Sequence, residues 1–194
     1  MSEAPQLTMP EAEAGVLREA YEGARVILEY GSGGSTVLAG GLDGKVVFSV
    51  EGDRKWLRMM RRWFRDNPPL ASVNLHWADI GPVKRWGIPR DDASFRTWPD
   101  YPLSVWDRPD FVQPDTVLID GRFRLGCFLA TLLRLSAPAV VLFDDYFPRK
   151  KYRVAEDFAT PVARIGRMAR FEVTPLKLDA TDLRRVIGLM LDPA

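Results

Sequence analysis

Residues 26–36 read Val-Ile-Leu-Glu-Tyr-Gly-Ser-Gly-Gly-Ser-Thr, and this stretch decides the fold. The apolar run at its start predicts a buried strand. The glycines that follow allow a tight turn and a close approach of the backbone to a ligand. Ser35 and Thr36 can cap the helix that should begin there. Because such a turn presents free backbone N–H groups at the start of a helix, it can hold an anionic group such as a phosphate or a carboxylate.

Strands and helices alternate along the rest of the chain. Helical spacing predicts helices over 11–23, 36–42, 54–67, 125–135 and 151–164, and apolar runs predict strands over 26–28, 45–50, 73–77, 116–119 and 139–143. Residues 171–176 and 185–191 are expected to form a closing pair of strands. The pattern predicts one α/β domain over residues 1–194: a Rossmann-like, open, mostly parallel sheet with helices on both faces and an antiparallel C-terminal strand. Ligands of such sheets bind beyond the carboxyl ends of the strands.

Two segments depart from this alternation. Residues 1–10 are predicted to be an N-terminal tail. Residues 81–114 form an insertion rich in proline and tryptophan, and it is longer than an ordinary connection. Its aromatic residues, Trp86, Trp98, Tyr101 and Trp106, could wall an acceptor pocket. The insertion could equally be a structural flap that replaces a helix, and the sequence leaves both interpretations open.

Composition excludes several classes of protein. A net charge of +1 gives no general reason to expect a nucleic-acid partner. The basic run 54–65, which also contains Trp56 and Trp63, is therefore interpreted as a helix that packs one face on the sheet and exposes its charges. The single cysteine, Cys127, excludes an internal disulfide and suits a reducing compartment. No apolar run is long enough to cross a membrane. We therefore expect a cytoplasmic protein without a membrane partner, in an oligomeric state that the sequence does not set.

Two common interpretations of the glycine turn fit poorly. A dinucleotide-binding GxGxxG motif that starts at Gly31 would need a glycine at the position of Thr36. A phosphate-binding P-loop would need a lysine after the glycines. Instead, Glu29 precedes the GxGG sequence, and a second acidic residue, Glu51, ends the next strand. This arrangement resembles motif I and the following acidic motif of the class I S-adenosylmethionine-dependent methyltransferases.

The resemblance continues along the chain and spans residues 12–146. Val-Glu-Gly-Asp at 50–53 is similar to the acidic motif after the second strand, and Ala-Asp-Ile at 78–80 is similar to the end of the third. Asp-Thr-Val-Leu-Ile-Asp-Gly at 115–121 and Val-Val-Leu-Phe-Asp-Asp-Tyr at 140–146 resemble the fourth and fifth strands. An IDG strand end followed by an FDD strand end resembles the branch that includes the catechol O-methyltransferase-like enzymes.

The resemblance implies that S-adenosylmethionine is the cofactor. The backbone of the glycine turn would approach its methionine end, with Glu29 supporting the turn or the ammonium group. Glu51 would accept both ribose hydroxyls, and Asp79 and Ile80 would contact the adenine. The complete set of expected cofactor-binding residues is Glu29, Gly31, Ser32, Gly33, Ser35, Thr36, Glu51, Gly52, Asp79, Ile80 and Asp120.

Aspartates at neighbouring strand ends are the candidates for chemistry. Asp120 and Asp144 are the expected catalytic residues. Comparable positions in the catechol-type enzymes carry a divalent metal, so Asp120, Asp144 and Asp145 are also candidate magnesium ligands, although that family's pattern ends in Asp-Asn. Related sequences often follow IDG with Asp-His, whereas Arg122 stands after Gly121 here. The chain therefore lacks that histidine, and its only one, His76, is interpreted as a packed strand residue.

The leading prediction is methyl transfer to a small or medium-sized acceptor, at oxygen or nitrogen. Two alternatives remain open: a non-catalytic module of the same fold that binds S-adenosylmethionine or a protein partner, and a nucleotide-dependent transferase. Basic residues flank the predicted strand ends and could attract an anionic acceptor or form a solvated rim. They are Arg122, Arg124, Arg149, Lys150 and Lys151.

Overall fold

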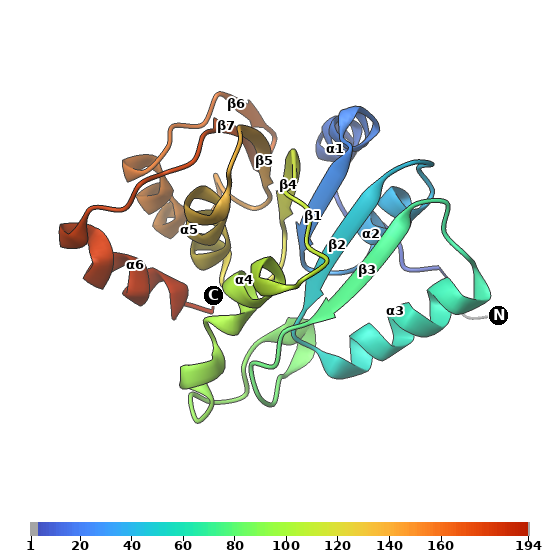
Figure 1. The fold of residues 1–194 in the computed structure, drawn as a ribbon, viewed down its shortest axis with the longest axis horizontal. Coiled ribbons are helices and arrows are strands. Elements are labelled where there is room, and N and C mark those ends of the chain that lie inside the picture. Colours follow the sequence, from blue (N-terminus) through green and yellow to red (C-terminus); the bar gives the residue numbers. More distant parts are fainter. Residues whose placement is uncertain (1–3, 194) are drawn as a thin grey trace.

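The computed structural model describes residues 4–193, which form one α/β domain around a seven-stranded sheet (Figure 1). The strand order is β3-β2-β1-β4-β5-β7-β6. Five strands are parallel: β1 (Val26–Tyr30), β2 (Val46–Glu51), β3 (Ser72–Trp77), β4 (Thr116–Ile119) and β5 (Ala139–Phe143). The strand β7 (Met168–Val173) is antiparallel to β5, and β6 (Ala163–Ile165) is antiparallel to β7. The predicted fold class, including its antiparallel C-terminal strand, is confirmed.

Helices cover both faces of the sheet (Figure 1). The first face carries α1 (Glu11–Gly23) and α2 (Gly34–Gly40), with α3 (Arg54–Asp66) beside α2. The second face carries α4 (Asp100–Leu103) and α5 (Arg124–Arg134), and α6 (Leu183–Met190) packs on α5. None of the helices between residues 4 and 193 combines the length and apolar character that a membrane span requires.

Burial on both faces explains why the strands read as continuous apolar runs. In β1, Ile27 packs against Leu17 and Tyr21 of α1, whereas its neighbour Leu28 belongs to the core cluster of the opposite face, which includes Phe128. Successive side chains of a strand point to opposite faces, so a strand covered by helices on both sides carries apolar residues on both of its faces. The parallel strands thus place their carboxyl ends together at one edge.

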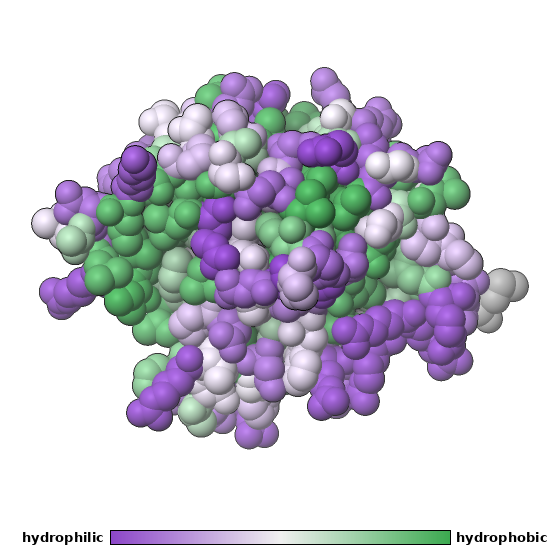
Figure 2. All heavy atoms as spheres, viewed as in Figure 1, coloured by the Kyte–Doolittle hydropathy of each residue, from purple (hydrophilic) through white to green (hydrophobic). Residues whose placement is uncertain are grey.

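The helix α3 shows why its basic residues are not buried. Leu57, Met60 and Phe64 are buried along one face, and the arginines lie on the other. Hydrophilic side chains accordingly gather over α3 in Figure 2. The carboxylate of Asp53 caps the helix by accepting hydrogen bonds from the backbone N–H groups of Lys55 and Trp56. This is the arrangement expected for an amphipathic helix on the sheet.

Two sequence predictions of secondary structure are wrong. Residues 151–164 are not an α-helix: a 3₁₀ segment, η4 (Lys150–Asp157), is followed by strand β6, and Pro161 lies between them. Proline disfavours a helical conformation of the residue before it and cannot donate a backbone hydrogen bond. Residues 185–191 are not a strand but part of α6, because Val186 and Met190, four residues apart, are buried against α5. The strand β7 pairs instead with β5 and β6.

The insertion 81–114 packs on the sheet and also lines a cavity, and its predicted role in holding an acceptor stays a prediction. It consists of short elements: η1 (Arg85–Gly87), η2 (Phe95–Thr97), α4 and η3 (Ser104–Asp107). Trp106 is buried and donates an indole N–H to the hydroxyl of Tyr30, which donates in turn to the carbonyl of Pro102. Four other residues of the insertion, Arg85, Trp86, Gly87 and Tyr101, line a cavity. The insertion therefore replaces a covering helix and also contributes to the ligand edge of the sheet.

Candidate functional site

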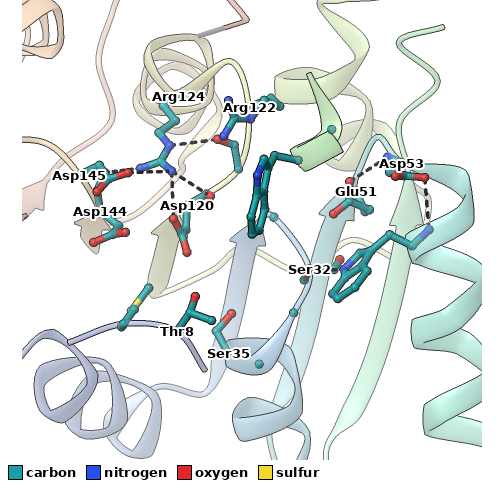
Figure 3. Close-up of a pocket in the computed structure, with 18 of the residues that line it drawn as sticks. Thr8, Ser32, Ser35, Glu51, Asp53, Asp120, Arg122, Arg124, Asp144 and Asp145 are labelled. Carbon is teal, nitrogen blue, oxygen red and sulfur yellow. Dashed lines mark hydrogen bonds and ion pairs between the residues drawn. The ribbon is translucent and has the colours of Figure 1, made fainter. Parts of the chain in front are cut away.

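A cavity of about 700 Å³ lies beyond the carboxyl ends of β1, β2, β4 and β5. The strand order reverses between β1 and β4, which is where open α/β sheets bind ligands. Figure 3 shows two groups of labelled residues across it: Glu51 and Asp53 on one side, and the aspartates with Arg122 and Arg124 on the other. The cavity is lined by Gln6–Met9, Gly31–Ser35, Glu51, Asp53, Trp56, Arg85–Gly87, Tyr101, Asp120–Arg122, Arg124, Asp144, Asp145 and Arg167.

The glycine turn brings backbone from two strands into contact. Gly31 has a φ of +105°, a conformation that L side chains rarely adopt. A Cβ atom at Gly31 would lie 2.9 Å from the Cα of Gly121, at the end of β4. Gly33 differs, because its backbone is extended and a Cβ atom there would meet no atom within 4 Å. Of these two glycines, only Gly31 is therefore required by the protein's own packing.

Contacts between the hydroxyl groups of Ser32, Thr36 and Ser49 hold the glycine turn in place. The Ser49 hydroxyl of β2 lies 2.7 Å from that of Ser32 and 3.2 Å from that of Thr36. The Thr36 hydroxyl also accepts a hydrogen bond of 2.9 Å from the backbone N–H of Gly33. The two contacts with Ser49 are buried and the bond from Gly33 is partly buried, and together they fix the conformation of the turn. Of the predicted cofactor-binding hydroxyls, Ser32 and Ser35 line the cavity and Thr36 does not.

Glu29 lies in the protein interior next to the glycine turn, outside the cavity lining. Its carboxylate is completely buried and accepts a hydrogen bond of 2.7 Å from the Tyr21 hydroxyl. Burial raises the pKa of Glu29, and nearby hydroxyls, first that of Thr36, oppose this rise. Its Oε2 is buried with no hydrogen-bond partner among the described residues. Since Glu29 does not line the cavity, its position fits the predicted support of the turn.

The N-terminal segment crosses the turn. Leu7 and Met9 pack against the core of the first face, and residues 6–9 line the cavity. A Cβ atom at Gly34 would collide with the backbone of Gln6 and Leu7, so a glycine is needed at the start of α2. The predicted tail, 1–10, is therefore packed where the structure describes it, and residues 1–3 lie outside the described residues. No motif in the sequence marks this segment as part of the site.

Glu51 is placed at the end of β2 as expected. Its Oε1 accepts a hydrogen bond of 2.8 Å from the backbone N–H of Asp53. Burial raises its pKa to about 7, and that N–H opposes the rise. Beside it, Trp56 is partly exposed, and its indole N–H donates to the carbonyl of Ser32 at 2.7 Å. A buried carboxylate without a cationic partner is poorly solvated, so hydroxyl donors from a ligand would stabilise its charged form.

The expected adenine contacts do not line the cavity. The exposed carboxylate of Asp79 accepts a hydrogen bond from the N–H of Gly81, and the buried Ile80 packs against Gly52. The cavity lining does not include Asp79, Ile80 or Gly52. The residues of η1 line the cavity next to Glu51 instead. A Cβ atom at Gly87 would lie 3.6 Å from the Oε1 of Glu51. His76 also lies away from the cavity, with its ring 2.7 Å from the Ser104 hydroxyl.

Asp120 lies across the cavity from Glu51 (Figure 3). Its carboxylate accepts a hydrogen bond of 3.0 Å from Arg124, whose guanidinium also donates to the backbone carbonyls of Asp120, Gly121 and Asp144. Burial raises the pKa of Asp120 to about 7, the positive charge of Arg124 opposes the rise, and Asp144 adds to it. A carboxyl group with this pKa can exchange a proton at neutral pH.

The other two aspartates, Asp144 and Asp145, are bound by arginines. Arg167 donates two hydrogen bonds to Asp144, at 2.9 and 2.8 Å, and lies 3.2 Å from Asp145. Arg149 donates to Asp145 at 3.0 Å. Because Arg167 precedes the antiparallel strand β7, its approach to Asp144 follows from the sheet order. Spacing in the sequence gives no signal for it.

These contacts do not fit a divalent metal at Asp120, Asp144 and Asp145. Guanidinium groups occupy both oxygens of Asp144 and approach both oxygens of Asp145. A metal ion would have to displace these donors and remain close to several positive charges. Within residues 4–193, no group of three or more histidine, cysteine or acidic side chains is arranged to hold a metal ion. The predicted magnesium site is therefore not supported by the geometry.

We accordingly expect ligand binding and stability to be independent of divalent metal. Addition of 5–10 equivalents of MgCl₂ should leave the melting temperature unchanged, because the carboxylates are already neutralised by arginines. Removal of metal with EDTA should leave cofactor affinity, measured by calorimetry, within about twofold. A control at matched ionic strength with NaCl separates specific binding from screening. Stabilisation by magnesium beyond that control would contradict the expectation.

Backbone strain is concentrated at this cavity. Among the described residues, three that are not glycine have a positive φ: Trp86 at 67°, Phe123 at 51° and Asp145 at 56°. Trp86 and Asp145 line the cavity, and Phe123 lies between two residues that do. Each such conformation costs about 1–3 kcal/mol and tends to occur at functional sites. Their common location supports this cavity as the candidate functional site.

Comparison with solved structures identifies the class of fold. An O-methyltransferase from Bacillus cereus in complex with SAH has 16% identity and a TM-score of 0.54, over 89% of this chain and 84% of that one. TomG from Streptomyces achromogenes, an O-methyltransferase involved in tomaymycin synthesis and in complex with SAM, has 14% identity and a TM-score of 0.52, over 86% and 79%. The fold is that of the class I S-adenosylmethionine-dependent methyltransferases.

A nearer relative identifies the family. The crystal structure of a methyltransferase-like protein from Silicibacter pomeroyi has 52% identity and a TM-score of 0.95, over 98% of this chain and 99% of that one. The chain therefore belongs to a family of methyltransferase-like proteins within the class I S-adenosylmethionine-dependent methyltransferases, which confirms the resemblance found in the sequence. No protein-family model matches the chain, and no curated protein matches it.

Proposed function

We propose that this protein binds S-adenosylmethionine in the cavity and transfers its methyl group to a small or medium-sized acceptor, at oxygen or nitrogen. The position of Glu51 supports this proposal most directly. It is a half-buried carboxylate with no cationic partner among residues 4–193, and it lines the same cavity as the open backbone of Gly33. These two features fit the vicinal hydroxyls of a ribose and the methionine end of the cofactor.

Different residues of the site would contact different parts of the cofactor. Gly31, Ser32, Gly33 and Ser35 would contact the methionine end, and Glu29 and Thr36 would hold the turn from below. Glu51 would accept the ribose hydroxyls. The adenine would be covered by η1, whereas Gly52, Asp79 and Ile80 would support that region from outside the lining. When bound, the cofactor would supply a methyl group on a sulfonium, whose sulfur would leave as a neutral thioether as the methyl carbon forms its new bond to the acceptor.

Asp120 would act as the base that deprotonates the acceptor. Its carboxyl group lies on the far side of the cavity from Glu51, and burial raises its pKa to about 7. It would therefore take the proton that an acceptor hydroxyl or ammonium loses during methyl transfer. Asp144, the second expected catalytic residue, is bound through both oxygens by Arg167. We assign it a positioning role, in which it fixes Arg167 beside the acceptor region.

Calorimetry tests the first step of this proposal. S-adenosylmethionine and S-adenosylhomocysteine should each bind in a 1:1 ratio with the protein. NAD should not compete, because Thr36 stands where a dinucleotide-binding motif needs a glycine, and ATP should not compete, because the turn lacks the lysine of a P-loop. Failure of both cofactor forms to bind a folded sample would disprove the proposal. Binding without turnover of a labelled methyl group, tested over oxygen and nitrogen acceptors, would favour the non-catalytic module. Binding of ATP alone would favour the nucleotide-dependent transferase.

A further inference from the structure

The acceptor side of the cavity carries more positive than negative charge. Three lining aspartates, Asp120, Asp144 and Asp145, face three lining arginines, Arg122, Arg124 and Arg167, and a fourth arginine, Arg149, binds Asp145 from outside the lining. Lys150 and Lys151 follow directly in the sequence. Three of the four arginines are bound to the aspartates, so the remaining one, Arg122, decides what else this side of the cavity can bind.

Three arginines are committed to the protein itself. Arg124 donates to one carboxylate and three backbone carbonyls, and its side chain is almost completely buried. The guanidinium of Arg167 donates two hydrogen bonds to Asp144. The guanidinium of Arg149 donates to Asp145 and to the Tyr152 hydroxyl. These guanidinium groups hold the carboxyl ends of β4 and β5 together. Their donors are largely used before any ligand arrives.

Arg122 has no such commitment. Its backbone is fixed, because its N–H donates to the Tyr101 hydroxyl and its carbonyl accepts from the thiol of Cys127. Its guanidinium makes no ion pair with any residue in 4–193, and its Nε is buried without a hydrogen-bond partner. Burial and the positive charge of Arg124 both lower the pKa of Arg122. A partly buried cation next to other cations is a site that favours an anion.

We propose that the acceptor carries an anionic group, a carboxylate or a phosphate, which the guanidinium of Arg122 binds on the Asp120 side of the cavity. This inference rests on the proposed function, since it names the class of acceptor for the same site. The planar guanidinium matches both groups through two parallel N–H donors, which gives orientation as well as affinity. The anion would hold the acceptor on the side of the cavity where Asp120 can take its proton.

The position of Arg122 separates this anion from the cofactor. Arg122 follows Gly121 just beyond the end of β4, and Figure 3 shows it near Arg124 and away from Ser35 of the glycine turn. Gly87 of η1 lies between Arg122 and Glu51, because a Cβ atom there would be 3.7 Å from the Cγ of Arg122 and 3.6 Å from the Oε1 of Glu51. The methionine carboxylate would be held at the glycine turn. Arg122 is therefore free to select the acceptor, and a bound cofactor should leave it accessible.

Fluorine NMR on the full chain tests this proposal with three probes of similar shape. They are para-trifluoromethyl benzoate, para-trifluoromethylphenyl phosphate and the neutral para-trifluoromethyl benzamide, each titrated at constant ionic strength with and without saturating S-adenosylhomocysteine. At least one anion should bind about tenfold or more tightly than the amide, a difference of about 1.4 kcal/mol. The preferred anion then identifies the carboxylate or the phosphate as the recognised group.

Variants localise the effect. Arg122→Gln should weaken anion binding about tenfold and leave amide binding unchanged, and Arg122→Lys should retain part of the anion affinity. Arg58→Gln, which removes an exposed arginine of α3 outside the cavity, is the matched control and should bind as the unaltered protein does. Melting curves verify that each variant is folded.

Three results would overturn the proposal. They are equal affinity for anions and amide, unchanged anion binding by Arg122→Gln, and loss of anion binding when S-adenosylhomocysteine is added. The last result would assign Arg122 to the methionine carboxylate. If S-adenosylhomocysteine itself fails to bind, the proposed function fails, and the titrations without it still decide whether Arg122 binds anions.

Discussion

Gly31→Ala should destabilise the protein and abolish binding of S-adenosylhomocysteine, whereas Gly33→Ala should weaken binding alone. At Gly31, φ is +105° and the added Cβ would lie 2.9 Å from both the Cα and the N of Gly121. Because both neighbours are backbone atoms, the strands β1 and β4 would have to separate. We expect a cost of about 2–4 kcal/mol and a fall in melting temperature of about 5–12 °C.

Gly33 provides the matched comparison. Its backbone is extended, and a Cβ atom there meets nothing within 4 Å, so Gly33→Ala should melt within about 2 °C of the unaltered protein. The added methyl would project from a turn that lines the cavity, and we expect about tenfold weaker binding in calorimetry. Unchanged affinity in folded Gly33→Ala would remove this turn from the binding site. Normal stability of Gly31→Ala would contradict the backbone argument.

Glu51→Gln should change stability and binding in opposite directions. The pKa of Glu51 is raised from 4.5 to about 7 in the folded protein, so the unfolded chain ionises first as the pH increases. The contribution of this group to stability is therefore lost between pH 4.5 and 7 and stays lost above pH 7. At pH 8, Glu51→Gln should be more stable than the unaltered protein by on the order of 1–3 kcal/mol. At pH 4 the two should melt alike.

The affinity for S-adenosylhomocysteine should increase with the fraction of Glu51 that is ionised. A carboxylate can accept both ribose hydroxyls, whereas a glutamine has one acceptor oxygen, so we expect Glu51→Gln to bind S-adenosylhomocysteine about 10–100-fold more weakly at pH 8. Affinity of the unaltered protein should rise from pH 6 to pH 8 and level off above the pKa, and the variant should lack this slope. Calorimetry over that range measures both. A variant that keeps the slope would show that another group is responsible.

The sequence predicts the parallel half of the fold because its signals are local. Apolar runs such as 26–28 and 139–143 need only burial on both faces, and Asp53 marks the start of α3 by capping it. The C-terminal part depends on partners elsewhere. Residues 185–191 are apolar enough for a strand, and only the packing of Val186 and Met190 on α5 makes them helical. Periodicity could have indicated this, because the two are four residues apart.

The site was predictable where strands end and unpredictable where other segments cross it. Glu51 and Asp120 follow directly from strand ends, and both line the cavity. Residues 6–9 and 85–87 reach it through loops whose path no pattern encodes. The metal prediction did not fit because Arg167 is distant from Asp144 in the sequence and meets it only through the antiparallel pairing of β7.

The contact between Gly31 and Gly121 also bears on how the protein folds. These residues are far apart in the sequence, and their strands can pair only after the segment between them, which includes the insertion, has been accommodated. Closing such a long loop is slow compared with forming helices. We therefore expect the cavity to form late in folding, so that a partly folded chain should not bind the cofactor. Cofactor present during refolding should accordingly protect the finished protein without accelerating its formation.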